Sequence, residues 1–268
     1  MSRQDNQPDW DTLAEKFDLW APHIAPVGDA LLAALDAQPG EHILDLASGT
    51  GEPALTLAKR QPLVKITGTD AADGMTQVAE RKAREQGLDN LHFQTMAAEA
   101  LSFPDAHFDR ICCRFGVMLF SDPAAGLQQM QRVLKPGGRC ALAVWDRLEG
   151  MTTVHWTQQV FEARIPASEQ PAVDKITSMS GGVLEALLAE AGFSDIETQL
   201  NRFEYRFPDF DAYWQNCVDS AIMKQQLDAL QPGQLDEVRA AFAALATPYQ
   251  TDGALVIPHE YRLAVAVK

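Results

Sequence analysis

The stretch from Ile43 to Lys59 constrains the fold more than any other part of this chain. Its first residues, Ile43–Leu46, form a short apolar run typical of a strand that is buried on both faces. The run ends in the sequence Ala-Ser-Gly-Thr-Gly at 47–51, where two glycines let the backbone turn tightly and approach a ligand. Helical spacing resumes at Glu52, and Pro53 falls in the first turn, where its missing N–H costs no hydrogen bond. Strand, glycine turn and helix start predict a nucleotide-type binding corner at the carboxyl end of a parallel strand.

Two ligand classes use such a corner. The segment Gly49–Ala54 fits the dinucleotide pattern G-x-G-x-x-A, and Asp70 follows at about the 20-residue distance of a ribose-binding acid. Asp45, however, lies inside the strand, two residues before the turn. The resulting pattern, Asp-x-Ala-x-Gly-x-Gly, resembles motif I of the class I S-adenosylmethionine-dependent methyltransferases. A buried acid gains nothing beside a phosphate but stabilises an amino group and a sulfonium, so it favours S-adenosylmethionine over a nicotinamide nucleotide.

Apolar runs and helical spacings alternate after this corner. We expect strands at 64–69, 91–96, 108–114 and 140–145, separated by helices that include 72–86 and 123–134. This alternation predicts a parallel, doubly wound α/β sheet. Two amphipathic helices, 9–19 and 27–35, precede the sheet and are separated by Pro22 and Pro26. Beyond Asp146 the rhythm changes, with helices interrupting two further strands near 196–206 and 260–267.

Further landmarks extend the resemblance over nearly the whole chain. The segments 67–70, 98–109, 114–118 and 133–138 are similar, in order and spacing, to blocks of the group that includes the ubiquinone/menaquinone C-methyltransferases. The resemblance implies a Rossmann-like, doubly wound, seven-stranded and mostly parallel sheet with an antiparallel last strand. It also implies that helices within 210–245 are inserted before that strand as a helical lid. We expect an N-terminal helical cap at 1–38, a cofactor-binding core at 39–146 and completion of the sheet with the lid at 147–268, all in one structural domain.

The resemblance also assigns residues to the cofactor. Asp70 would bind the ribose hydroxyls and Met75 would pack on the adenine, while Phe17 and Trp20 lie in a segment similar to one that closes over the cofactor. The remaining expected cofactor contacts are Asp45, Ala47, Gly49, Thr50, Gly51, Ala71, Ala98, Glu99, Arg114 and Phe115. Ala97 departs from the family, which usually has an aspartate there to accept the adenine amino group. Backbone groups of Ala98 and Glu99, or the Glu99 side chain, are the expected substitutes.

Methyl transfer from a sulfonium needs alignment and an environment that tolerates a cation, and it needs a base only if the accepting atom must lose a proton. His23 and His155 are candidate catalytic bases because an unperturbed imidazole titrates near neutrality, with an ordinary surface or core histidine as the alternative for each. Phe17, Trp20 and Trp156 either form an aromatic wall facing the sulfonium or are the packed faces of helices. No cluster has metal-ligand spacing, so no metal is expected.

Composition limits the partners. The chain has 22 basic and 37 acidic residues in 268, a net charge of −15, which argues against nucleic acid or an anionic membrane surface. It shows no N-terminal signal and no long apolar run, so we expect a cytoplasmic protein without stable membrane insertion, as a monomer or homodimer. The expected function is S-adenosylmethionine-dependent methylation of carbon or oxygen in a small, apolar or aromatic acceptor. The alternatives are a nicotinamide-dependent oxidoreductase and a protein that binds S-adenosylmethionine without transferring the methyl group.

Overall fold

The computed structural model describes residues 9–170, 173–220 and 222–268. Its centre is one sheet with the strand order β3-β2-β1-β4-β5-β8-β6, to which the two-residue β7 is added beside β8. The strands are β1 (His42–Leu46), β2 (Lys65–Asp70), β3 (Leu91–Thr95), β4 (Phe108–Arg114), β5 (Leu134–Trp145), β6 (Ser194–Phe207), β7 (Gln250–Thr251) and β8 (Ala254–Val267). β1 to β5 pair in parallel, whereas β8 is antiparallel to both β5 and β6. The predicted Rossmann-like sheet with its antiparallel last strand is confirmed, and β7 is an addition to the seven expected strands.

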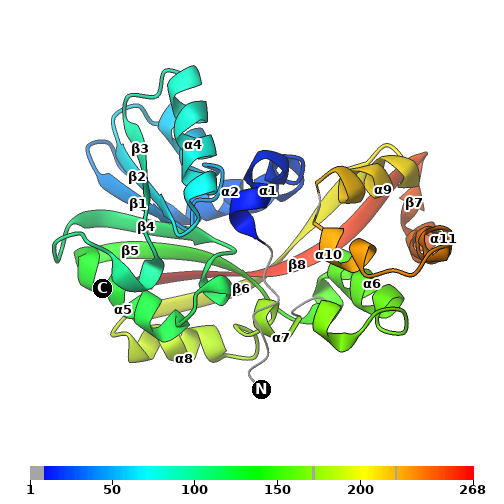
Figure 1. Cartoon of the computed structure of the whole chain (residues 1–268). Helices are drawn as coiled ribbons and strands as arrows, with labels where there is room; N and C mark the ends of the chain where they lie inside the picture. Colours follow the sequence, from blue (N-terminus) through cyan, green and yellow to red (C-terminus); the bar gives the residue numbers. More distant parts are fainter. Residues whose placement is uncertain (1–8, 171–172, 221) are drawn as a thin grey trace.

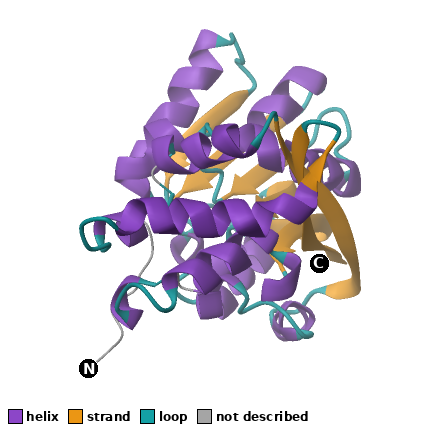
Figure 2. Cartoon of the chain, turned by 90° about the vertical axis from the view of Figure 1, so that its right-hand side faces the viewer, coloured by secondary structure: helices purple, strands orange, loops and turns teal. Residues whose placement is uncertain are grey.

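Helices cover both faces of this sheet, as the view from the lid side also shows (Figure 2). They are α1 (Trp10–Phe17), α2 (Ala21–Leu35), α3 (Ala54–Arg60), α4 (Asp73–Glu85), α5 (Pro123–Val133), α6 (Thr152–Phe161), α7 (Val173–Ile176), α8 (Val183–Glu190), α9 (Phe210–Asp219), α10 (Lys224–Asp228) and α11 (Gln234–Ala246). Short 3₁₀ turns occur at Ala98–Ala100, Val117–Leu119, Leu148–Gly150, Ala167–Glu169 and Thr247–Tyr249. No helix within the described ranges has the length and apolar character that a membrane span requires.

Alternation along β1 sorts its side chains between two cores. Ile43 packs with α2 and α3 on one face, whereas Leu44 and Leu46 pack with α5 and α8 on the other. Successive strand residues point to opposite faces, so Asp45 shares the face of Ile43. The sequence therefore places a carboxylate under α2 and α3, at the end of β1 where the chain turns.

The break between the first two helices differs from the prediction. α2 begins at Ala21, with Pro22 in its first turn and Pro26 inside it, and the chain turns at 18–20 instead. Pro22 costs nothing there because the first helical N–H groups have no intrahelical partner. The turn at 18–20 contacts the glycine corner, as described below.

β6 and β8 continue beyond the rest of the sheet as a two-stranded arm, in which Phe203–Phe207 pairs with Leu255–His259. α6, α9, α10, α11, the turn at Thr247–Tyr249 and β7 lie at the far end of this arm and are here called the lid (Figure 1). β8 begins at Ala254, earlier than predicted, because the strand continues through Pro258. At that level β5 no longer pairs with β8, since their ladder ends at Trp145 and Tyr261, so proline is tolerated. The segment 210–245, predicted to contain inserted helices, forms α9, α10 and α11.

Candidate active site

The glycine corner adopts the backbone that its sequence predicts. Gly49 and Gly51 have φ of 54° and 106°, and Ala47 also has a positive φ of 54°. At Gly51 an added Cβ would lie 2.8 Å from the Leu55 side chain, so only glycine fits both the dihedral angle and the space. The turn therefore brings backbone close to the carboxyl end of β1, where ligands of open parallel sheets bind.

Asp45 is buried at this corner, with 1% of its surface exposed. Its Oδ1 accepts a hydrogen bond from Cys112 Sγ at 3.4 Å, whereas no described residue hydrogen-bonds its Oδ2. Burial raises the pKa of Asp45 to about 7, and the nearby Arg114 guanidinium opposes that rise. A buried carboxylate with an unused oxygen is a site for a cationic or hydrogen-bond-donating ligand group.

Asp70 ends β2 and holds the turn in place. Its Oδ2 accepts the Gly49 N–H at 2.9 Å, and its Oδ1 accepts the Ala72 N–H at 3.0 Å. Burial raises the pKa of Asp70, while these backbone donors lower it. Ala71, the next predicted contact, is exposed beside it.

Arg114 connects the corner to α2. Its Nη2 donates to the Glu52 carbonyl at 2.9 Å and its Nη1 to the Ile24 carbonyl at 3.5 Å. Gly28 of α2 permits this approach, since a Cβ there would lie 3.3 Å from Nη1. Beside Arg114 is a hollow of about 370 Å³, lined by the 18–29 segment, the start of α3, Arg60 and Lys82.

Two other predicted contacts are directed toward α1 and the turn at 18–20, which together with α2 are called the cap from here on. Thr50 donates its hydroxyl hydrogen to Asp18 rather than presenting it to the corner. Met75 is 3% exposed and packs in a small core with Ala14 of α1. Phe17 does lie over the turn, because its ring is 4.0 Å from the Cβ position of Gly49.

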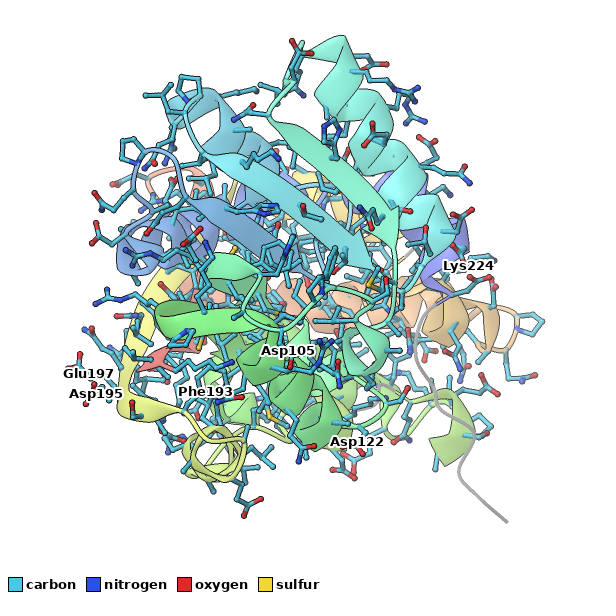
Figure 3. All side chains as sticks on the ribbon, turned by 90° about the vertical axis from the view of Figure 1, so that its left-hand side faces the viewer. Asp105, Asp122, Phe193, Asp195, Glu197 and Lys224 are labelled. Carbon is cyan, nitrogen blue, oxygen red and sulfur yellow. The ribbon has the colours of Figure 1, made fainter. Side chains whose placement is uncertain are left out.

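The segment expected to recognise adenine is formed by the 3₁₀ turn at Ala98–Ala100. Ala98 is buried there, whereas the Glu99 Oε1 accepts the Asp122 N–H at 3.1 Å. Asp122 caps α5, and Figure 3 shows it at the start of that helix. The Glu99 side chain is thus engaged by α5, and its substitution for the missing acid at Ala97 stays a prediction.

A row of rings, here called the aromatic cluster, follows the carboxyl ends of β4 and β5 onto the β6–β8 arm. Its members are Trp20, His23, Phe115, Trp145, Phe203, Tyr205, Phe207, His259 and Tyr261. Phe115 stacks on Trp145 at 4.0 Å, and Trp145 stacks on Phe203 at 5.9 Å. Tyr205 lies 4.0 Å from the His259 ring and 5.4 Å from Trp20. The cluster provides an apolar surface beside the glycine corner.

The structure distinguishes the predicted bases. His23 joins the aromatic cluster, 4.2 Å from Phe207, and burial lowers its pKa. His155 is partly buried on α6, and no ring contact among the described residues includes it. Trp156, the next residue, is buried against Tyr213 and Tyr249, as the packed face of a helix would be.

Sequence reasoning missed His259. Its ring is 1% exposed, and its Nε2 accepts from the Thr153 N–H at 3.3 Å and lies 2.9 Å from Thr153 Oγ1. Its Nδ1 lies 3.1 Å from the Ile257 carbonyl, which assigns the proton to Nδ1. Burial lowers the pKa of His259 to about 4. The continuous apolar run at 254–257, before Pro258, could have indicated that the strand begins earlier and includes His259.

Comparison with known proteins agrees with this arrangement. A family model described as a methyltransferase domain matches residues 43–138. An uncharacterized protein of Mycobacterium tuberculosis is 30% identical over 91% of this chain and 88% of its own length. Demethylmenaquinone methyltransferase of Deinococcus radiodurans is 42% identical over 40% of this chain and 44% of that protein. The match thus spans less than half the length of such curated relatives.

Solved structures share the fold. The YcgJ protein of Bacillus subtilis has a TM-score of 0.59 and 20% identity over 91% of this chain and 98% of its own. A methyltransferase from Aquifex aeolicus has a TM-score of 0.54 and 20% identity over 73% of this chain and 91% of its own. Sheet order, glycine corner and buried acid define a Rossmann-like methyltransferase fold. The chain belongs to the class I S-adenosylmethionine-dependent methyltransferases, in the group similar to the ubiquinone/menaquinone C-methyltransferases.

Proposed function

We propose that this protein transfers the methyl group of S-adenosylmethionine to carbon or oxygen of a small, planar, apolar or aromatic acceptor. The observation that carries the proposal is Asp45, whose buried Oδ2 has no partner among the described residues. Ser48 Oγ and Thr69 Oγ1, at the same corner, are likewise buried and without a described partner. These oxygens suit a ligand that brings its own hydrogen-bond donors and positive charge.

The cofactor supplies an electrophilic methyl group, and the residues of this chain bind and align the reactants. Asp45 and the glycine turn would hold the amino-acid end of the cofactor, and Asp70 its ribose. The Phe115–Trp145 stack lies at the ends of β4 and β5, next to this corner, and suits a flat acceptor ring. Alignment and exclusion of water are the main requirements of such a displacement.

His23 is the proposed base if the acceptor must lose a proton. Its lowered pKa keeps the imidazole neutral at pH 7 and able to accept a proton within the aromatic cluster. His155 is the less favoured candidate because the aromatic cluster does not include it. The presence of a demethylmenaquinone methyltransferase among the relatives supports a quinol-like acceptor within this proposal.

Calorimetric titration with S-adenosylmethionine and S-adenosylhomocysteine tests the cofactor, using wild type, Asp70→Ala and the control Asp105→Ala. The Asp105 side chain is 78% exposed and pairs with Arg132 of α5, away from the glycine corner. We expect binding by wild type and the control, and loss of binding in Asp70→Ala. Binding of a nicotinamide nucleotide with no heat from either sulfur ligand would overturn the proposal.

Transfer itself is tested with methyl-labelled S-adenosylmethionine and a panel of quinols, phenols and primary amines. Label is expected in quinols or phenols, and His23→Ala should reduce the turnover rate more than His155→Ala. Cofactor binding without transfer to any acceptor class would favour a binding protein instead.

A further inference from the structure

The turn at 18–20 contacts the glycine corner through one carboxylate. Asp18 Oδ1 accepts the Thr50 hydroxyl hydrogen at 2.6 Å and a hydrogen of Lys82 Nζ at 3.0 Å. Lys82 Nζ also donates to the Thr50 carbonyl at 2.9 Å. Asp18, Thr50 and Lys82, here called the clasp, therefore join the cap, the glycine turn and α4 at one point.

Other contacts hold the cap without including the glycine turn. Arg81 and Glu15 form a two-pronged pair at 2.9 Å, and Asp11 Oδ1 accepts the Gly74 N–H at 2.6 Å. Both contacts connect α1 only to α4. These contacts serve as a comparison for the clasp, because they are also hydrogen bonds to carboxylates but do not involve Thr50.

Burial distinguishes the two kinds of contact. The Lys82 and Asp18 side chains are 21% and 38% exposed, whereas those of Arg81 and Glu15 are 45% and 68% exposed. Exposed ion pairs are screened by water and contribute little. A partly buried ammonium with two oxygen partners loses more when one is removed, because the charge is left incompletely paired. The clasp is thus the stronger of the two attachments.

The clasp also lies at the glycine corner, where the cofactor is proposed to bind. Phe17, next to Asp18, has its ring 4.0 Å from the Cβ position of Gly49, and the hydroxyl and carbonyl of Thr50 are both occupied by the clasp. On the far side of the turn, Trp20 Nε1 donates to Ser220 Oγ of the lid at 2.7 Å. The cap therefore lies across the corner, fixed to the glycine turn on one side and to the lid on the other.

We propose that Asp18 is a positioning residue which, through Thr50 and Lys82, holds the cap closed over the glycine corner and sets the dissociation rate of the cofactor product. The inference rests on the proposed function, because it concerns exchange at the same site. Opening the cap breaks the bonds of Asp18, so the clasp adds to the barrier for release. Closing it orients Thr50 and hence the turn that contacts the ligand.

The test measures dissociation of S-adenosylhomocysteine by stopped-flow displacement from full-length protein. Asp18→Ala and Lys82→Met should each raise the dissociation rate at least about tenfold, as expected for losing a charge-assisted hydrogen bond. Thr50→Val, which keeps the shape but loses the hydroxyl, should raise it similarly. The double variant Asp18→Ala/Lys82→Met should raise the rate by less than the product of the two single effects, because both single variants remove the same Asp18–Lys82 contact.

Glu15→Gln is the matched control, since it weakens the cap on α4 away from the glycine turn, and its rate should stay within about twofold of wild type. A purely structural role would lower the folded fraction without changing the dissociation rate of the folded protein. Unchanged rates in the clasp variants, or an equal effect of Glu15→Gln, would overturn the proposal.

Failure of the proposed function can be distinguished from failure of the clasp proposal. If wild type binds no S-adenosylhomocysteine, hydrogen exchange of the amides at 13–20 tests the clasp alone. Faster exchange in Asp18→Ala than in Glu15→Gln would support the clasp as the closing contact of the cap, and equal exchange would refute it.

Discussion

Replacing Asp45 with asparagine should stabilise the ligand-free protein at neutral and alkaline pH. The side chain is buried, and its pKa rises from 3.8 in the unfolded chain to about 7 in the fold. Between these values the native state holds a proton that the unfolded state has released. The free energy of unfolding of wild type therefore falls as pH rises through this window and levels off above it.

The size of the effect follows from the shift. One pKa unit corresponds to about 1.36 kcal/mol, so a rise from 3.8 to about 7 costs wild type up to about 4 kcal/mol at high pH. More than half of that loss falls between pH 5 and pH 8, because the pKa of the folded state lies within this interval. The asparagine side chain of the Asp45→Asn variant would keep the shape and the contact with Cys112 but would not titrate.

Urea unfolding at pH 5 and pH 8 measures the difference between wild type and Asp45→Asn. The gap in unfolding free energy should widen at pH 8 in favour of the variant, while its affinity for S-adenosylmethionine falls. Asp105→Asn, at an exposed position, should show no such pH-dependent gap. A gap between wild type and Asp45→Asn that stays constant with pH would refute the burial argument.

Three further substitutions probe the fold around the site. Gly68→Ala places a Cβ 2.3 Å from the Phe93 ring and should lower the free energy of unfolding, measured in urea, by about 1–3 kcal/mol. Adding Phe93→Leu should recover part of this loss, and no recovery would contradict the clash. Phe242→Ala empties a fully buried lid position and should cost about 3–5 kcal/mol, whereas a cost below about 1 kcal/mol would mean that the lid core relaxes. His259 has its pKa lowered from 6.5 to about 4, so wild type should lose up to about 3 kcal/mol as pH falls through that window. His259→Gln should remove this acid-side loss in melts at pH 4.5 and 7, and an unchanged slope would exclude His259 as its source.

The sheet could be predicted because its signals are local. Buried strands such as β4 read as short apolar runs, and the glycines of the corner are required by backbone geometry at their own positions. Asp45 was identified for the same reason, since a carboxylate within an apolar strand stands out without any knowledge of its neighbours.

The cap and lid could not be predicted in detail because they depend on contacts between distant segments. Pro26 lies inside α2 and Pro258 inside β8, where neighbouring elements override the local preference of proline. Thr50 was expected to face the ligand, yet its hydroxyl donates to Asp18, 32 residues away. The environment of His259 likewise depends on Thr153, which is 106 residues distant.

The position of β8 between β5 and β6 has a consequence for how the chain folds. β1 to β5 are joined by short crossovers, so these strands can pair with one another early in folding. The outer edge of β5, in contrast, stays unpaired until β8 forms, and β8 follows the whole lid in the sequence. Closing so long a loop is slow, and an open strand edge can meanwhile pair with another molecule. We therefore expect the refolding yield to fall as the protein concentration rises. Docking of β8 is the step at which assembly of the sheet competes with aggregation.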